Sequence, residues 1–277
     1  ILAIGLFVVL VTGGIDISFA ATASVAQYVA AYAATRLNLP PAVVLVVGLT
    51  VGTLLGFFNA ILIDRLRATA IIITISSMSV YFALLMYFTG GKSIYGLPGW
   101  WSDSMVLFEV ATGPDQSARF TLPILVMLVV AVFTAFIMNR TSLGRQLYAM
   151  GGNPEAARRV GVSLSTMQWF AYGYLGLLAG VAGLLQAHRV GESVPNAMIG
   201  TELNVVAAAV LGGASLLGGI GSVSGVVLGI FLLAILRNGL NLLGVSPYFF
   251  QIVIGLILLA STGITGLSLR RRRVAEA

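Results

Sequence analysis

The chain has 277 residues, of which 58% are hydrophobic and only 9% are charged, with a formal net charge of +6. Because a soluble domain carries roughly 25% charged residues, this composition excludes a cytosolic enzyme, a secreted domain, a disordered chain and a free nucleic-acid-binding protein. The mean hydropathy of +1.02 and the long apolar runs predict an integral membrane protein. Cysteine is absent and His188 is the single histidine, so we expect no disulfide and no metal site.

Nine apolar runs predict nine spanning segments in an all-α, polytopic membrane bundle, because lipid leaves the backbone few other ways to satisfy its hydrogen bonds. The runs cover residues 1–12, 17–35, 41–63, 69–88, 121–138, 167–188, 203–217, 221–236 and 248–266. Together they form a single transmembrane domain over residues 1–277. Ile1 already lies within an apolar run, so we expect one span before it and about ten in the full-length chain.

The basic residues between the runs predict how the bundle is oriented. With nine alternating crossings, ten arginines fall on one side: Arg65, Arg67, Arg140, Arg145, Arg158, Arg159, Arg270, Arg271, Arg272 and Arg273. The other side receives five basic residues: Arg36, Lys92, Arg119, Arg189 and Arg237. By the positive-inside rule the first group and the C-terminus are cytoplasmic. The net charge therefore reflects membrane topology rather than nucleic-acid binding.

The stretch at residues 12–18 interrupts an apolar region with two glycines and a carboxylate. Broken helices in transporters expose backbone groups and helix ends to substrate, although a plain cytoplasmic turn would have a similar composition. Polar side chains within apolar runs are costly, which makes them candidates for function, while each one alone is more often a helix–helix hydrogen bond. The candidate substrate path comprises Gly13, Gly14, Asp16, Ser18, Asn59, Ser76, Glu202 and Asn204.

Two sets of glycines at four-residue spacing predict close helix packing in lipid. They are Gly48, Gly52 and Gly56 in the third run, and Gly221, Gly225 and Gly229 in the eighth. Because these two runs are five segments apart, they cross in opposite directions, as expected for two inverted halves of five spans each. No Gly-Lys-Ser/Thr follows the glycine-rich residues 211–225, which argues against a phosphate-binding loop.

The outer connection, residues 89–120, is long and contains Trp100 and Trp101. Tryptophan is enriched at membrane interfaces, so a solvated loop with its indoles at the lipid surface is one interpretation. A docking or lid element on the outer face is the other, and the sequence leaves both open.

The inner connection, residues 139–166, predicts a cytoplasmic coupling loop with a two-turn helix over residues 154–160. Asn153 can cap this helix, Pro154 suits its first position, and Gly161 can end it in a left-handed conformation. An acidic first turn and a basic last turn match the helix dipole. Because two turns are too short to be stable alone, we expect the helix to dock into a partner. The expected contact residues are Asn153, Pro154, Glu155, Ala156, Ala157, Arg158 and Gly161.

Several of these motifs resemble a known family. Residues 151–161, GGNPEAARRVG, resemble the EAA-x3-G cytoplasmic loop of ABC importer permeases. Residues 12–18, TGGIDIS, look like the GGIDLS signature of the ribose-type sugar permeases, and residues 209–219, AVLGGASLLGG, resemble the late glycine-rich segment of that family. Residues 89–98, TGGKSIYGLP, look like the corresponding loop of autoinducer-2 permeases. The matches follow the family's order and extend over nearly the whole chain.

The resemblance implies the permease subunit of an ABC importer in the bacterial inner membrane, translocating a monosaccharide or related small polyol. A separate ATPase pair would dock on residues 154–161 and bind the ATP, so this chain would need no cofactor. A periplasmic substrate-binding protein would deliver the sugar, and a second permease would complete a homo- or heterodimer. From this resemblance we expect the family's first span to precede Ile1.

Two alternatives remain open. A branched-chain amino acid permease of related fold would need a buried counter-charge, for which the interior offers few candidates beyond Asp16 and Glu202. A stand-alone secondary transporter would use an ion gradient and an essential membrane carboxylate such as Asp16. A membrane enzyme is disfavoured, because His188 has no evident nucleophile and no paired acidic, His or Ser groups form a catalytic set.

Overall fold

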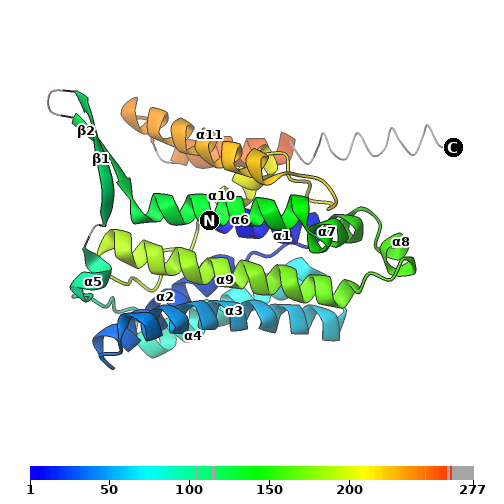
Figure 1. Cartoon of the computed structure of the whole chain (residues 1–277), viewed down its shortest axis with the longest axis horizontal. Coiled ribbons are helices and arrows are strands. Elements are labelled where there is room, and N and C mark those ends of the chain that lie inside the picture. Colours follow the sequence, from blue (N-terminus) through cyan, green and yellow to red (C-terminus); the bar gives the residue numbers. More distant parts are fainter. Residues whose placement is uncertain (104, 114–115, 247, 261–262, 264–277) are drawn as a thin grey trace.

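A computed structural model describes residues 1–103, 105–113, 116–246, 248–260 and 263. Its longer helices run side by side along the long axis of the molecule (Figure 1). The helices and strands are α1 Leu2–Val11, α2 Phe19–Thr35, α3 Pro41–Leu66, α4 Ala70–Thr89, α5 Gly99–Ser102, β1 Val106–Gly113, β2 Gln116–Thr121, α6 Leu122–Arg140, α7 Ser142–Gly152, α8 Pro154–Arg159, α9 Leu164–Val190, α10 Glu202–Leu211, α11 Val223–Leu242 and a last helix Tyr248–Ala260.

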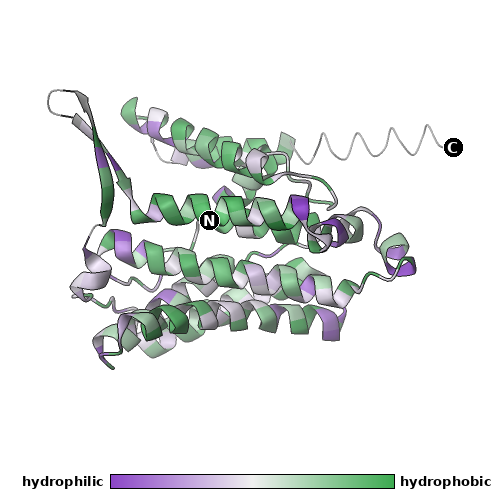
Figure 2. Ribbon diagram, in the orientation of Figure 1, coloured by the Kyte–Doolittle hydropathy of each residue, from purple (hydrophilic) through white to green (hydrophobic). Residues whose placement is uncertain are grey.

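Among the described residues, five helices are long and apolar enough to cross a membrane: α3, α4, α6, α9 and α11. Apolar residues cover most of their length (Figure 2). Each of the nine predicted apolar runs contains one helix, and the structure is that of a mostly helical, polytopic membrane protein. The helices α1 and α10 and the last helix are shorter, so the count of nine crossings stays a prediction.

The two ends of the bundle differ in the elements they hold. Figure 1 shows α7, α8 and the C-terminal ends of α3 and α6 at one end, and α5 and the β-hairpin at the other. Basic residues of the predicted cytoplasmic group occupy the last turns of α3, α6 and α8. The predicted cytoplasmic arginines 270–273 lie outside the described residues. The distribution of the remainder agrees with the positive-inside orientation.

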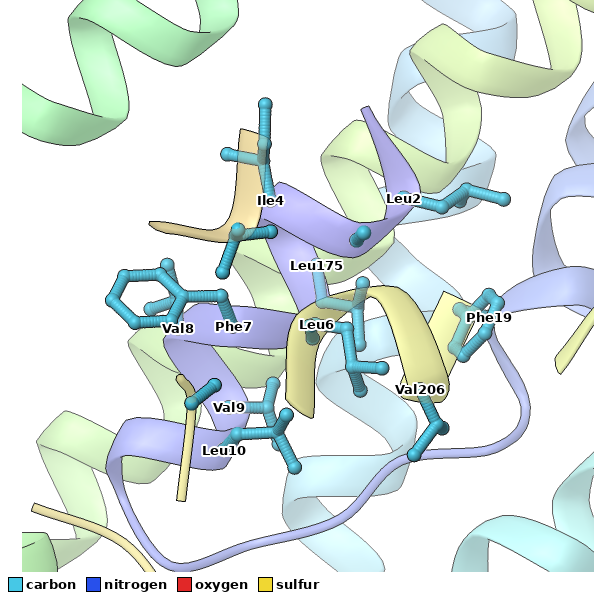
Figure 3. Close-up of a cluster of buried hydrophobic side chains, with 14 of the residues drawn as sticks. Leu2, Ile4, Leu6, Phe7, Val8, Val9, Leu10, Phe19, Leu175 and Val206 are labelled. Atoms are coloured by element: carbon cyan, nitrogen blue, oxygen red, sulfur yellow. The ribbon is translucent and has the colours of Figure 1, made fainter. Parts of the chain in front are cut away.

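The short helix α1 lies at the centre of the bundle. All ten of its residues are buried, including those on every side of the helix. Leu6 and Phe7 project from α1, with Leu175 of α9 and Val206 of α10 close by (Figure 3). A helix that is apolar all round and surrounded by protein belongs to the core rather than to the lipid-facing surface.

The most extensive helix packing joins α3 to α9. A Cβ at Gly52 would overlap the carbonyl oxygen of Gly176, and a Cβ at Gly56 would overlap that of Tyr172. At Gly48 the same atom would lie 2.9 Å from the side chain of Leu184. Only glycine allows the two backbones to approach this closely, which is the packing that four-residue glycine spacing gives in membranes.

The second glycine set is divided by the fold, so part of its expected geometry is wrong. The predicted run 221–236 begins as a helix only at Val223, and Gly221 lies before it with φ +141. Gly225 and Gly229 lie in α11, where added Cβ atoms would overlap the carbonyl oxygens of Gly212 and Ala208. Two of the three predicted glycines therefore pack α11 closely against the end of α10, and the third lies in the loop before α11.

The run 203–217 is also shorter as a helix than predicted. The helix α10 ends at Leu211 because Gly212 and Gly213 follow, and Gly213 has φ +88. Left-handed backbone is available to glycine without a steric cost, so a glycine pair stops the helix although the apolar character continues. Residues 212–222 form a loop instead.

The outer connection contains secondary structure that the sequence analysis did not predict. After α5, strands β1 and β2 form an antiparallel hairpin that extends from the bundle (Figure 1). The rings of Phe108 and Phe120 stack with their centroids 4.5 Å apart, and Arg119 pairs with Glu109 at 3.1 Å. A hydrogen bond from Ser117 and the Arg119 guanidinium lower the pKa of Glu109.

Candidate coupling helix and transport path

The short helix α8 has the caps that its sequence predicts. The Asn153 side chain accepts a hydrogen bond from the Ala156 amide at 3.0 Å, and Pro154 occupies the first position. At the other end Gly161, with φ +89, donates from its amide to the Arg158 carbonyl at 3.0 Å. The caps satisfy backbone groups that a two-turn helix would otherwise leave unpaired. They keep α8 helical despite its length.

One face of α8 is held by the protein and the other is exposed. Ala157 is buried, whereas Glu155, Arg158 and Arg159 are exposed. Val160 is 80% exposed although it lies beyond the membrane-spanning helices. The exposed face of α8 is therefore mainly charged, with one apolar side chain directly after its C-terminal end.

The preceding helix, α7, was missed by the sequence analysis. The Thr141 side chain caps it by accepting from the Gly144 amide at 3.2 Å, and Leu147 is fully buried beneath it. The signal was present as a threonine followed by apolar residues at Leu143, Leu147 and Met150, which is amphipathic helical spacing. The helix α7 connects α6 to α8, so α8 follows a helix that is packed against the bundle rather than an irregular loop.

The break at residues 12–18 joins α1 to α2 and needs both of its glycines. Gly13 has φ +82, a conformation that favours glycine. At Gly14 a Cβ would lie 2.7 Å from the Tyr172 hydroxyl of α9. These two positions therefore have steric reasons to be glycine, and their role in the substrate path stays a prediction.

A buried polar network holds the same break in place. Asp16 accepts hydrogen bonds from the Ser18 amide at 2.6 Å and from the Ser18 hydroxyl at 2.7 Å. Asn59 of α3 donates to the Ser18 hydroxyl at 2.6 Å, and Tyr81 of α4 donates to the Asn59 carbonyl oxygen at 3.0 Å. Asp16, Ser18 and Asn59 are at most 2% exposed. We call these four residues, all of them buried, the Asp16 network.

The other predicted path residues lie elsewhere. Ser76 is exposed on α4, while its neighbour Ser77 is buried. Glu202 is buried in the first turn of α10, where a carboxylate is favoured by the helix dipole. Asn204 lies two positions further along α10 and lines a cavity. The predicted path residues therefore form no single site.

The cavity that contains Asn204 has a volume of about 840 Å³ and lies between α6, α9, α10, α11 and the last helix. Its polar side chains are mostly neutral amides, with one hydroxyl and two guanidinium groups. They belong to Gln186, Arg189, Asn204, Arg237, Asn238, Asn241, Ser246 and Gln251. Among the described residues that line the cavity, none is an aspartate or glutamate. The sequence analysis found Asn204 and missed the amides of α11.

Comparison with known proteins adds to this geometry. Residues 1–262 match the family described as branched-chain amino acid transport system / permease component. The chain belongs to this family. It is also similar to the ribose import permease protein RbsC of Haemophilus influenzae, with 32% identity over 261 residues that cover 94% of this chain and 79% of the relative. No solved structure matches the chain.

Two further relatives carry different substrates in their names. The fructose import permease protein FrcC of Rhizobium meliloti is 30% identical over 92% of this chain and 71% of its own length. The autoinducer 2 import system permease protein LsrC of Yersinia pestis is 35% identical over 94% of this chain and 71% of its own length. Family membership and the helical bundle identify this chain as a membrane permease component, as the sequence resemblance predicted.

Proposed function

We propose that this chain is the membrane-spanning subunit of a bacterial ABC importer in the inner membrane and that it translocates a sugar or related small polyol. The observation that carries the proposal is α8. It is capped at both ends, fixed to the bundle through Ala157, and presents charged side chains and Val160 to the surroundings. A separate ATPase pair docks on this exposed face, and its closure and opening move α8. The ATPase binds and hydrolyses the ATP. This chain transmits the resulting movement through α8 and forms the route that the substrate takes across the membrane.

The amide-lined cavity supports a polyol as the substrate. Amide and hydroxyl groups can both donate and accept hydrogen bonds, so they match the hydroxyl groups of a sugar. A zwitterionic amino acid would leave its ammonium group without a counter-charge there, because no described carboxylate lines the cavity. The relatives named for ribose, fructose and autoinducer 2 agree with this choice. The branched-chain amino acid in the family description is the alternative substrate.

The topology completes the proposal. We infer that the chain crosses the membrane nine times and that its helices form parts of two inverted halves. In such an arrangement α3 and α11 occupy equivalent positions and run in opposite directions, which agrees with their directions in Figure 1. Inverted repeats place a substrate site between the halves. A second permease covers the exposed amides of α11, and a periplasmic binding protein delivers the sugar at the end of the bundle that holds the hairpin.

The test is recovery of an ATPase with the full-length protein solubilised from its native membrane. Glu155→Lys and Gly161→Arg alter the exposed face and the C-terminal cap of α8, whereas Glu192→Lys makes the same charge change beyond the end of α9. We expect the wild type and Glu192→Lys to retain the ATPase. Each α8 variant should lose roughly tenfold or more in ATPase affinity, as central interface residues usually do.

A folded, abundant wild-type protein with no ATPase would contradict the proposal and favour an ion-coupled secondary transporter. Substrate is tested on the same preparation after reconstitution into liposomes with its ATPase and binding protein. We expect uptake of labelled ribose, fructose or another monosaccharide, and we expect that leucine does not inhibit this uptake. Leucine uptake with no uptake of any sugar would favour the amino acid alternative.

A further inference from the structure

Three segments that are far apart in the sequence meet next to α8. They are residues 11–14 at the end of α1, residues 148–151 near the end of α7, and residues 215–221 in the loop between α10 and α11. The Gly219 amide donates to the Val11 carbonyl at 2.9 Å, and the Tyr148 hydroxyl donates to the Gly221 carbonyl at 2.8 Å. We call this contact the glycine junction.

The backbones in the glycine junction touch directly. A Cβ at Gly151 would overlap the Val11 carbonyl oxygen and would lie 2.6 Å from the Gly219 amide nitrogen. A Cβ at Gly218 would lie 2.8 Å from the Cα of Gly13 and 2.9 Å from the carbonyl oxygen of Gly151. With no side chain between the backbones, a displacement of one segment cannot be absorbed by a rotamer change. The segments must move together or separate.

Each segment of the junction leads to a different part of the molecule. Gly152 ends α7 and is followed directly by Asn153, the cap of α8. Residues 11–14 lead into the Asp16 network, which binds α2, α3 and α4. Residues 215–221 lie between α10 and α11, which contribute Asn204, Asn238 and Asn241 to the cavity. At the junction all three routes share backbone contacts with the residues that directly precede the cap of α8.

We propose that the glycine junction transmits movement of α8 to the helices around the cavity, and that Gly151 is the positioning residue of this contact. The proposal rests on the proposed function, since it assumes that an ATPase moves α8. When α8 is displaced, Gly151 carries the displacement to the end of α1 and to the loop after α10. The cavity walls on α10 and α11 then change together with the α1–α2 break.

The experiment compares Gly151→Ala with Gly152→Ala in the reconstituted full-length importer. The two residues are adjacent and both lie in α7, but a Cβ at Gly152 meets no atom within 4 Å. Three quantities are measured: the ATPase that co-purifies, ATP hydrolysis, and sugar uptake per ATP hydrolysed. Gly151→Ala should keep the ATPase bound and active while uptake per ATP falls at least tenfold. Gly152→Ala should match the wild type in all three.

A milder variant, Tyr148→Phe, removes only the hydroxyl that donates to Gly221. Since a single hydrogen bond contributes about two- to tenfold in an equilibrium, we expect uptake per ATP to fall by about that factor, while the protein stays folded and binds the ATPase as the wild type does. If Gly151→Ala fails to fold, this variant decides the matter. If the folded variants bind the ATPase and their uptake per ATP is unchanged, the role of the glycine junction is overturned, while the proposed function still stands. Absence of the ATPase from the wild type would overturn the proposed function and this role with it.

Discussion

The helices α3 and α11 are both long, apolar and rich in glycine, but they are used differently. On α3 the glycines at 52 and 56 lie against the backbone of α9. On α11 the N-terminal glycines pack against α10, whereas Gly239 in the C-terminal half has no atom within 4 Å of its Cβ position. Apolar character therefore predicts a spanning helix without indicating which helices pack closely. Glycine at four-residue spacing indicates close packing, since the α3 glycines at this spacing lie against the α9 backbone.

The exposed side of α11 differs from the exposed side of α3 in its polar residues. Asn238 and Asn241 are exposed and line the cavity, among apolar residues such as Ile235 and Leu242 that are also exposed. Amides are costly in contact with lipid. The α3–α9 contact is thus a permanent structural interface, while the C-terminal half of α11 is suited to contact with water, substrate or a second permease.

The largest effect is expected from filling the α3–α9 contact. Gly52→Ala places a methyl group against the Gly176 carbonyl and the backbone of Gly180. Overpacking of this kind typically costs about 1–3 kcal/mol, and here backbone rather than a movable side chain must shift. We expect a lower thermal midpoint in detergent and a lower yield of folded protein, measured by size-exclusion chromatography after heating.

The control for this prediction is Gly239→Ala in α11. The same methyl group enters open space there, and alanine has the higher helix propensity. We expect a thermal midpoint equal to or above that of the wild type. Equal loss of stability in both variants would mean that glycine matters for helix flexibility and not for the closeness of α3 to α9.

A smaller effect is expected from the Asp16 network. Asn59→Leu keeps a similar volume but removes the donor to Ser18 and the acceptor for Tyr81. Leaving buried polar groups unpaired costs about 1–3 kcal/mol, so the thermal midpoint should fall. Ser76→Ala, on the exposed side of α4, should leave it unchanged. Full stability of Asn59→Leu with loss of uptake would instead support the direct substrate role that the sequence predicted for Asn59.

The parts of this fold that follow from local chemistry were predictable from the sequence. The caps of α8 depend on Asn153, Pro154 and Gly161, which act on their immediate neighbours. The spanning helices follow from apolar run length. Close packing at Gly52 was also predicted from the glycine spacing. The identity of the partner helix, α9, was not, because the spacing on one helix contains no information about the second.

The remaining features depend on contacts between distant segments. The pairing of Asn59 with Ser18, and the meeting of Gly151 with Val11 and Gly219, arise only when the bundle assembles. The end of α10 at Leu211 was missed because hydropathy continues through the glycines that follow. Likewise, Asn204 was predicted as one of many polar residues, and only the assembled cavity separates it from Ser76.

The smallest effect is expected in the cavity. Asn204→Ala removes one amide from a wall that contains several, so the other polar groups still bind the substrate. One lost hydrogen bond should raise the KM for sugar uptake about two- to tenfold with little change in maximal rate. Asn196→Ala, an identical change at an exposed position after α9, should leave KM unchanged. A fall in maximal rate at constant KM would instead place Asn204, and with it the N-terminal part of α10, in the conformational step rather than in substrate binding.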